Sequence, residues 1–396
     1  VLALVLYPYV YMLARTAFEQ QDKNLLRAGR TLGLSARQTI IKVVIPLARP
    51  AIMVAASLVM METIADFATV QYFAVNTLTT AIYDTWLGYG DMPAANALAS
   101  VLLMFVLFAV VAEQRSRAGQ RHQSNRPNTE NQRIHLSLLG QITANLFCWF
   151  LVFAGFILPF VLLINMAVDY ADSSQLTLLI DIGINTLEIA CYAATGAVLM
   201  SLVLALLKRF QSGWQNSLPL QLSSFGYAIP GTVLAMALMA AFAPIDHAIN
   251  DLAVWANFDK PGLILSGTTF AIIFAFIVRF AAISNGTVGA GIEKIAHSLD
   301  KAPASLGVGI IGTIHHIHLP LLKKSILVAW LLVFVESMKE LPAVLLLRPF
   351  NFETLATFIY QLISDEQLEQ GAIGAIFIVL FGLLPIIWLN KSDSAA

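Results

Sequence analysis

Residues 25–46 read LLRAGRTLGLSARQTIIKVVIP, and residues 299–320 read LDKAPASLGVGIIGTIHHIHLP. Each stretch contains a Leu-Gly pair, and in each a proline follows thirteen residues after the glycine. The matching positions are Leu32-Gly33 with Pro46 and Leu306-Gly307 with Pro320, a constant separation of 274 residues. The chain therefore contains an internal repeat.

The same separation continues into the apolar stretch that follows each copy. It pairs Glu62 with Glu336 and Asp66 with Glu340. Within each copy the two acidic residues are spaced i, i+4, which predicts that their carboxylates share one face of a helix. Within the second copy four predicted spans precede the loop, whereas within the first copy only one partial span precedes it. We therefore expect about three further spans, on the order of 130–140 residues, ahead of Val1, and a parent chain with two parallel six-helix halves.

The composition excludes a soluble globular protein. Hydrophobic residues make up 58% of the 396 residues and charged residues only 12%, whereas a soluble domain has about 25% charged residues. Apolar runs that approach the ~20 residues needed to cross a bilayer do not alternate as barrel strands would. We predict an all-α polytopic membrane protein with nine spans, at 1–14, 50–74, 94–112, 138–168, 182–207, 218–243, 263–283, 325–347 and 372–389.

The basic residues indicate the orientation, because Lys and Arg concentrate in cytoplasmic loops. Of the 23 basic residues, 20 fall in alternate connections when Arg279, near the end of the predicted span 263–283, is counted with the connection that follows it. These connections include both copies of the repeated loop. Both loops are therefore predicted to be cytoplasmic. Residues 113–137 form a polar stretch rich in helix breakers, which indicates a cytoplasmic linker between two bundles.

The repeated loops resemble the signature of the membrane subunits of binding-protein-dependent ABC importers: E-A-A, a glycine, then I-x-L-P. The matching residues are Arg27-Ala28-Gly29, Gly33 and Pro46 in the first copy and Lys301-Ala302-Pro303, Gly307 and Pro320 in the second. Arg27 and Lys301 stand where the signature has glutamate. The resemblance implies that each loop is a coupling helix that lies in a groove of an ATPase. An ordinary amphipathic helix at the membrane surface is the alternative.

The resemblance also predicts the fold and its division along the chain. We expect a tandem repeat of six-helix type I importer domains, with the first half truncated at its N-terminus. Residues 1–112 would be the C-terminal part of the first half, with its coupling loop at 24–49. Residues 138–391 would be the complete second half, with its coupling loop at 284–324.

Further stretches are similar to the fused permeases of ferric-iron importers. They are Ala65-Asp66-Phe67, Tyr227-Ala228-Ile229-Pro230-Gly231 and Lys339-Glu340-Leu341-Pro342-Ala343. The resemblance implies ferric iron as the transported substrate. Fused permeases for thiamine, phosphonate and polyamines share the architecture, so these substrates stay as alternatives.

The chain has no G-x-x-x-x-G-K-[ST] motif, so we do not expect it to bind ATP phosphates itself. The resemblance implies that ATP and Mg are bound by a dimer of partner ATPase subunits and that a periplasmic binding protein delivers the substrate. We expect a transport subunit in the bacterial inner membrane, with no enzymatic activity, no cofactor of its own and no nucleic-acid partner. A secondary transporter with parallel repeats is the alternative from another class.

Ionisable and helix-breaking residues in the spans are candidates for a translocation pathway. A charge at the centre of a membrane helix costs about 3 kcal/mol, and carboxylate oxygens suit Fe(III). Lys339 is placed to neutralise Glu336, and a proline and glycine inside a span predict a kink or broken helix. The candidates are Glu62, Asp66, Glu336, Lys339, Glu340, Tyr227, Pro230 and Gly231. Structural pairs and a packing kink are the alternatives. We expect His315, His316 and His318 to contact the ATPase or lipid headgroups rather than a metal.

Overall fold

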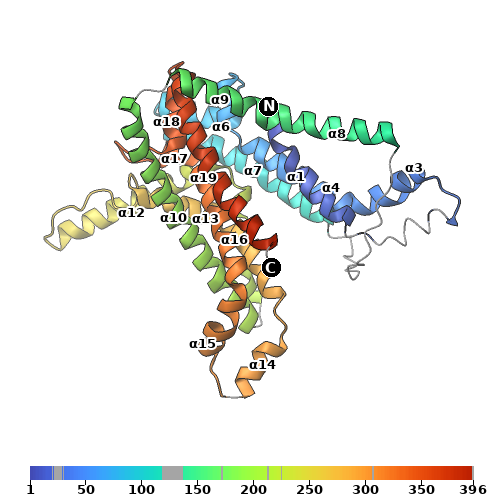
Figure 1. Ribbon diagram of the computed structural model, residues 1–396. Helices are drawn as coiled ribbons and strands as arrows, with labels where there is room; N and C mark the ends of the chain where they lie inside the picture. The colour runs from blue at the N-terminus through green and yellow to red at the C-terminus, as the bar shows by residue number, and fades with distance from the viewer. Residues whose placement is uncertain are drawn as a thin grey trace. The chain divides into compact units, whose positions relative to one another are not determined.

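The computed structural model describes residues 1–19, 21, 29, 31–117, 137–170, 173–211, 214–223, 225–305 and 307–394. Among these residues every regular element is a helix and there is no strand (Figure 1). This confirms the predicted all-α class. The chain forms two compact units, one of residues 1–69 and 103–162 and the other of residues 70–102 and 163–396. The units reflect contacts in space, so the predicted division of the sequence into two permease halves stays a prediction.

In the first unit, α1 (Leu2–Glu19) packs against α4 (Ile45–Ala65). The unit also contains α8 (Leu138–Val152) and the π-helical turn η3 (Phe153–Ile157). A Cβ atom at Gly155 would lie 2.9 Å from the carbonyl oxygen of Leu4. Glycine therefore allows η3 to lie directly against the backbone of α1.

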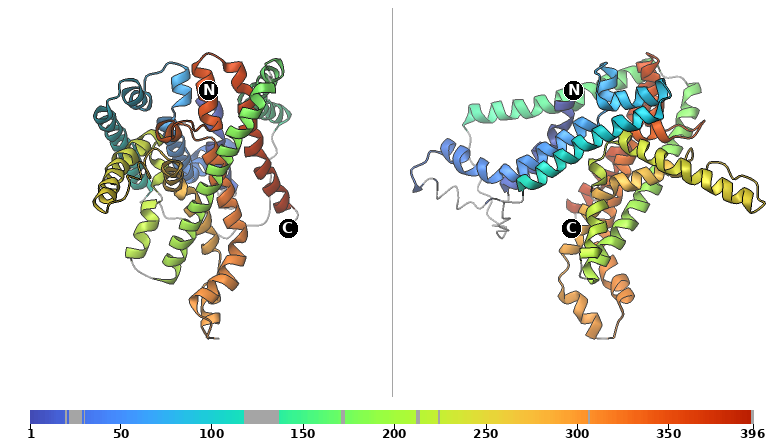
Figure 2. Two further views of the ribbon diagram at one scale, coloured as in Figure 1. Left: turned by 90° about the vertical axis from the view of Figure 1, so that its left-hand side faces the viewer. Right: turned by 180° about the vertical axis from the view of Figure 1, so that it is seen from behind.

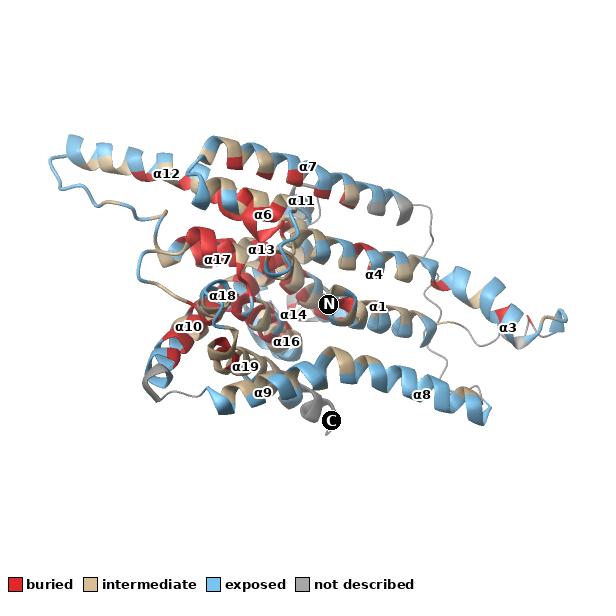
Figure 3. Ribbon diagram, turned by 90° about the horizontal axis from the view of Figure 1, so that it is seen from above, coloured by how far each residue is buried: buried red, intermediate tan, exposed pale blue. Residues whose placement is uncertain are grey.

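The core of the second unit is formed by α10 (Ser173–Phe210), α13 (Thr269–Glu293) and α16 (Leu319–Met338). Alanines line these contacts, among them Ala193 and Ala275, both fully buried. Small side chains let membrane helices approach closely, which increases van der Waals contact where no hydrophobic effect drives association. Figure 3 shows buried residues gathered on α10, α13 and α17, whereas α8 is mostly exposed.

The remaining elements are shorter or connect these helices. They are α3 (Ala36–Thr39), η1 (Ile40–Val44), α5 (Ala68–Tyr72), α6 (Leu78–Tyr83), η2 (Asp84–Gly88), α7 (Met92–Arg117), α9 (Leu158–Asp169), α11 (Trp214–Ser223), η4 (Gly226–Ala228), α12 (Gly231–Trp255), α14 (Ser298–Ser305), α15 (Ile310–Thr313), η5 (Ile314–His318), α17 (Pro342–Leu347), α18 (Leu355–Ser364) and α19 (Leu368–Ser394).

Seven described helices are long and apolar enough to cross a membrane: 37–65, 92–112, 138–169, 176–210, 231–255, 269–293 and 310–338. The predicted first and last spans correspond to α1 and α19, which are helical but lie outside these seven. The predicted span at 218–243 is wrong in position. Ile229 is extended (ψ 121°) and α12 begins only after Pro230, because proline disfavours a helical residue before it.

This shift moves Asp246 from a predicted outer connection into α12, where it is fully buried. Its carboxylate accepts hydrogen bonds from the backbone N–H groups of Ile264, Leu265 and Ser266 at 3.1, 2.9 and 2.8 Å, and from the Ser266 hydroxyl at 2.6 Å. A buried carboxylate is tolerated when its oxygens are satisfied in this way. Asp246 therefore holds the connection that follows α12.

The two copies of the repeat have the same order of local structure. The starts of α3, η1, α4 and α5 correspond, at the separation of 274 residues, to the starts of α15, η5, α16 and α17. Past this point both copies have a helix with a capping box, formed by Thr77 with Thr80 and by Thr354 with Thr357. The repeat seen in the sequence is therefore also a repeat of backbone conformation.

Three π-helical turns have one cause in common. η1, η3 and η5 end two residues before Pro46, Pro159 and Pro320. A proline ring clashes with the carbonyl four residues earlier and cannot donate the hydrogen bond to it. The backbone widens there, and in η1 the N–H of Ile45 donates to the carbonyl of Ile40, five residues earlier. The helix thus continues through the proline without breaking.

Gly226 supplies a test of the packing in the second unit. Its added Cβ would lie 2.0 Å from the carbonyl oxygen of Val278, a backbone atom of α13. We expect Gly226→Ala to lower the free energy of unfolding by about 1–3 kcal/mol through overpacking, measured by denaturant unfolding in detergent. Gly286→Ala is the control, since a Cβ at Gly286 meets nothing within 4 Å. It should be neutral or stabilising by up to ~1 kcal/mol, and equal losses in both variants would contradict the packing described.

Candidate functional site

A buried ion pair lies where α16 ends. Nη1 of Arg279, on α13, is 2.8 Å from Oε1 of Glu340, and the side chains are 9% and 7% exposed. The guanidinium carbon also lies 5.7 Å from the centre of the Phe280 ring. Burying two charges is strongly unfavourable unless they pair with good geometry. The pair therefore fixes the position of the chain after α16 against α13.

Glu340 reaches Arg279 because the helix stops before it. α16 ends at Met338 and α17 begins at Pro342, so Glu340 lies in the short break between them. Its Oε1 also accepts a 3.4 Å hydrogen bond from the backbone N–H of Ala343, in the first turn of α17. The prediction that Glu336 and Glu340 share one helix face is wrong, because the helix does not continue through both residues.

The break predicted at Tyr227–Gly231 lies against this pair. η4 and the extended Ile229 separate α11 from α12, which confirms the predicted broken helix. A Cβ at Gly231 would lie 2.3 Å from Nη1 of Arg279 and 2.4 Å from Oε1 of Glu340. Glycine is therefore needed for the start of α12 to approach the pair. Pro230 is buried and Tyr227 is half-buried beside it.

Arg279 is the residue of this site that sequence reasoning missed. The charge pattern groups Arg279 with a cytoplasmic connection, whereas the residue lies in the middle of α13. Its position inside the predicted span 263–283 was a signal for its role, because a charge within a span needs a partner. Nothing in the sequence identifies Glu340 as that partner, since the two residues are 61 positions apart.

Glu336 and Lys339 form a second, more accessible ion pair. Nζ of Lys339 is 2.9 Å from Oε1 of Glu336, and the side chains are 48% and 20% exposed. This confirms the predicted neutralisation of Glu336. In the first copy, Glu62 and Asp66 are half-buried, and Asp66 lies just past the end of α4, where it accepts a 3.1 Å hydrogen bond from the Thr69 hydroxyl.

The two repeated loops contain the same left-handed turn. Gly33 and Gly307 have φ values of 81° and 73°, and a Cβ at either would meet nothing within 4 Å. The backbone conformation, not crowding, therefore requires glycine at these positions. Pro46 and Pro320 lie in the first turns of α4 and α16. Arg27 and Ala28 lie outside the described residues, and Lys301 and Ala302 are in α14, whose side chains at these positions are not described.

Both loops expose large apolar side chains. Leu32 is 80% exposed beside the first turn, and Ile311 is 84% exposed after the second. Among the described residues, no three His, Cys, Asp or Glu side chains come close enough to hold a metal ion. Exposed apolar side chains of this kind occur both on protein-binding surfaces and on helices that lie on a membrane.

Two relatives have sequences similar to nearly the whole chain. The chain is 24% identical over 402 residues to the Fe(3+)-transport system permease protein FbpB 2 of Haemophilus influenzae. The alignment covers 99% of this chain and 75% of that protein. It is 26% identical to the ferric transport system permease protein FbpB of Actinobacillus pleuropneumoniae, covering 95% of this chain and 56% of that protein. The chain thus spans three quarters of the first relative and little more than half of the second.

Residues 1–118 match the family described as binding-protein-dependent transport system inner membrane component. The chain is therefore similar to the permeases of binding-protein-dependent importers. The fold is similar to that of a chain in the solved structure of a bacterial alginate ABC transporter in complex with an alginate pentasaccharide-bound periplasmic protein. The TM-score is 0.50 and the sequence identity is 18%, and the match covers 64% of this chain and 93% of that chain. The seven long apolar helices of the described residues, together with the family match, indicate a multi-pass inner membrane protein.

The ion pair of the permease can be tested by removing one partner. Glu340→Ala leaves the Arg279 guanidinium buried and unpaired, so we expect a loss of about 3–5 kcal/mol in the free energy of unfolding. Glu336→Ala breaks the accessible pair with Lys339 and should cost about 1 kcal/mol or less. Denaturant unfolding of both variants in detergent measures the difference.

A double variant separates charge pairing from lost volume. Arg279→Met with Glu340→Leu removes both charges and keeps apolar bulk, so it should regain most of the stability that Glu340→Ala loses. A double variant as unstable as the single one would show that the pair itself is not what holds α17 against α13.

Proposed function

We propose that this permease carries ferric iron across the inner membrane, using ATP that is hydrolysed by a separate ATPase subunit. The observation that carries the proposal is the pair of matched loops, each with a left-handed glycine and exposed apolar side chains. A helical loop with such a surface fits a groove on another protein. The similarity to two ferric permeases along nearly the whole chain supports iron as the substrate.

The loops have a direct mechanical connection to the spans. α3, η1 and α4 follow one another without a break, and so do α15, η5 and α16, because the residues that join them keep helical backbone angles. Each loop therefore enters a single rigid helix, of residues 37–65 or 310–338. In the proposed mechanism, closure of an ATPase dimer that holds ATP and Mg moves both loops, and each loop moves its helix.

The proposed pathway uses the accessible carboxylates. Glu336, Glu62 and Asp66 are half-buried, and in this proposal their carboxylate oxygens meet the passing Fe(III), a hard acceptor. Glu340 is already neutralised by Arg279, and in this proposal it holds the break near Tyr227, Pro230 and Gly231 instead of binding iron. Lys339 limits the negative charge at Glu336, which favours release of the cation.

Two substitutions test this pathway. We expect Glu336→Gln and Glu62→Gln, made separately, each to lower iron uptake by on the order of tenfold, which is a change of ~1.4 kcal/mol in the barrier. Assembly with the ATPase should be unchanged, because neither substitution removes bulk. Asp259→Asn, at an exposed position between α12 and α13, is the matched control. Normal uptake by both Gln variants would refute the pathway.

Reconstitution of the full-length parent protein tests the function. The protein is placed in vesicles with its ATPase, and ATP hydrolysis is measured with ferric-loaded and with empty binding protein. Stimulation by the ferric form alone is the expected result. Stimulation only by a binding protein loaded with thiamine, a phosphonate or a polyamine would keep the ATP-driven mechanism and refute iron. Failure of the ATPase to associate, with uptake driven by an ion gradient, would favour a secondary transporter.

A further inference from the structure

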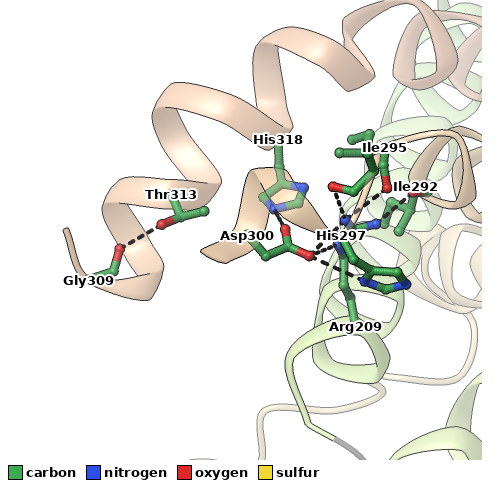
Figure 4. A network of polar contacts seen from close by, with 9 residues as sticks. Arg209, Ile292, Ile295, His297, Asp300, Gly309, Thr313 and His318 are labelled. Atoms are coloured by element: carbon green, nitrogen blue, oxygen red, sulfur yellow. Dashed lines mark hydrogen bonds and ion pairs between the residues drawn. The ribbon is translucent and has the colours of Figure 1, made fainter. Parts of the chain in front are cut away.

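The second coupling loop is tied to the spans by a cluster of charged residues that the proposed function does not use (Figure 4). Arg209 lies at the end of α10, Asp300 on α14 and His318 at the end of η5. Nη2 of Arg209 is 2.8 Å from Oδ2 of Asp300, and Nε2 of His318 is 2.9 Å from Oδ1 of the same carboxylate. One carboxylate on the loop thus contacts two spans, since η5 continues into α16.

The cluster is enclosed by protein. The side chains of Arg209 and His318 are 3% and 0% exposed, and that of Asp300 is 17% exposed. Burial by itself raises the pKa of Asp300, but the hydrogen bond and charge of Arg209, with His318, lower the pKa below its ordinary value. Asp300 is therefore ionised at neutral pH, and the Phe210 ring packs edge-on against His318 with centres 5.4 Å apart.

Arg209 also contacts the end of α13 and the residues just past it. Its Nη1 donates to the carbonyl of Ile292 at 2.8 Å, and its Nη2 donates to the carbonyl of Ile295 at 3.0 Å. Ile295 lies just past α13, and its N–H also donates to the Ile292 carbonyl at 3.0 Å. The guanidinium thus adds donors at a helix end, where carbonyls lack their usual partners four residues later. A single guanidinium therefore joins α10, the end of α13 and the coupling helix α14. Figure 2 shows α14 and α15 together at one end of α10, α13 and α16.

The first copy of the repeat has different residues at these positions. At the separation of 274 residues, His318 corresponds to Val44 and Asp300 to Leu26. The described contact at Val44 is a neutral one, a 2.9 Å hydrogen bond from Nε2 of Gln21 to the Val44 carbonyl. The first copy therefore has apolar residues where the second copy has His318 and Asp300.

We propose that Arg209, Asp300 and His318 are positioning residues that make the second coupling loop move as one body with α10, α13 and α16. Separating α14 from the spans would leave a buried charge unpaired, which is far more costly than breaking a neutral hydrogen bond. When the loop moves, the spans therefore move with it by the same amount. This rests on the proposed function, since it assumes that a partner ATPase moves the loop.

The test uses the full-length protein with its ATPase and binding protein in vesicles, and measures substrate uptake per ATP hydrolysed. Asp300→Asn and His318→Val should each lower this ratio by about fivefold or more, while ATP hydrolysis continues. Asp300→Glu, which keeps the charge, should restore part of the ratio. Asp251→Asn and His247→Val make the same chemical changes at exposed positions of α12 and should leave the ratio unchanged.

Hydrogen exchange of the purified permease gives a second measurement that needs no ATPase. Asp300→Asn should speed amide exchange in residues 298–305 by about tenfold, with the core of α10 unchanged. Uptake and hydrolysis that fall in proportion, or exchange in α14 that stays at the wild-type rate, would overturn the positioning role. Failure of the wild-type protein to stimulate any ATPase would refute the proposed function instead, and hydrogen exchange would still decide whether the cluster holds the loop.

Discussion

The need to pair every charge inside a membrane protein determines the arrangement of the second unit. Arg279 and Glu340 are both almost fully buried and 2.8 Å apart, and neither is stable there without the other. Their pairing requires α16 to end at Met338, requires the chain to turn before α17, and requires a glycine where α12 begins. The broken helix at Pro230 therefore packs against an ion pair whose acidic residue, Glu340, lies more than a hundred residues later in the chain.

The helical class and the repeat could be predicted from the sequence, because these depend on local composition and spacing. The ion pair between Glu336 and Lys339 is of this kind. Helix ends were harder to predict. A hydropathy run does not show that Pro230 divides one apolar stretch into two helices, and this error moved Asp246 to the wrong segment.

The contacts that could not be predicted join residues far apart in the sequence. Arg209 and Asp300 are separated by 91 positions, and Arg279 and Glu340 by 61. Periodicity identifies residues that share a helix face, but it does not identify which helices meet. His318 illustrates the difference: the sequence suggested a residue exposed to a partner or to lipid headgroups, whereas the structure buries it completely beside Asp300. That expectation was wrong because the end of α10 covers it.

The π-helical turns before Pro46 and Pro320 have an effect on the direction in which each loop faces. A π-helical turn contains one more residue than an α-helical turn, and an α-helix rotates about 100° per residue. The extra residue in η1 or η5 therefore changes the rotational phase of the helix between the loop and the span by roughly that angle. The five residues of η1 or η5 thus determine which residues of α3 or α15 face outward, independently of how the span packs. A single insertion or deletion in these turns would rotate the loop about the helix axis and leave the span in place.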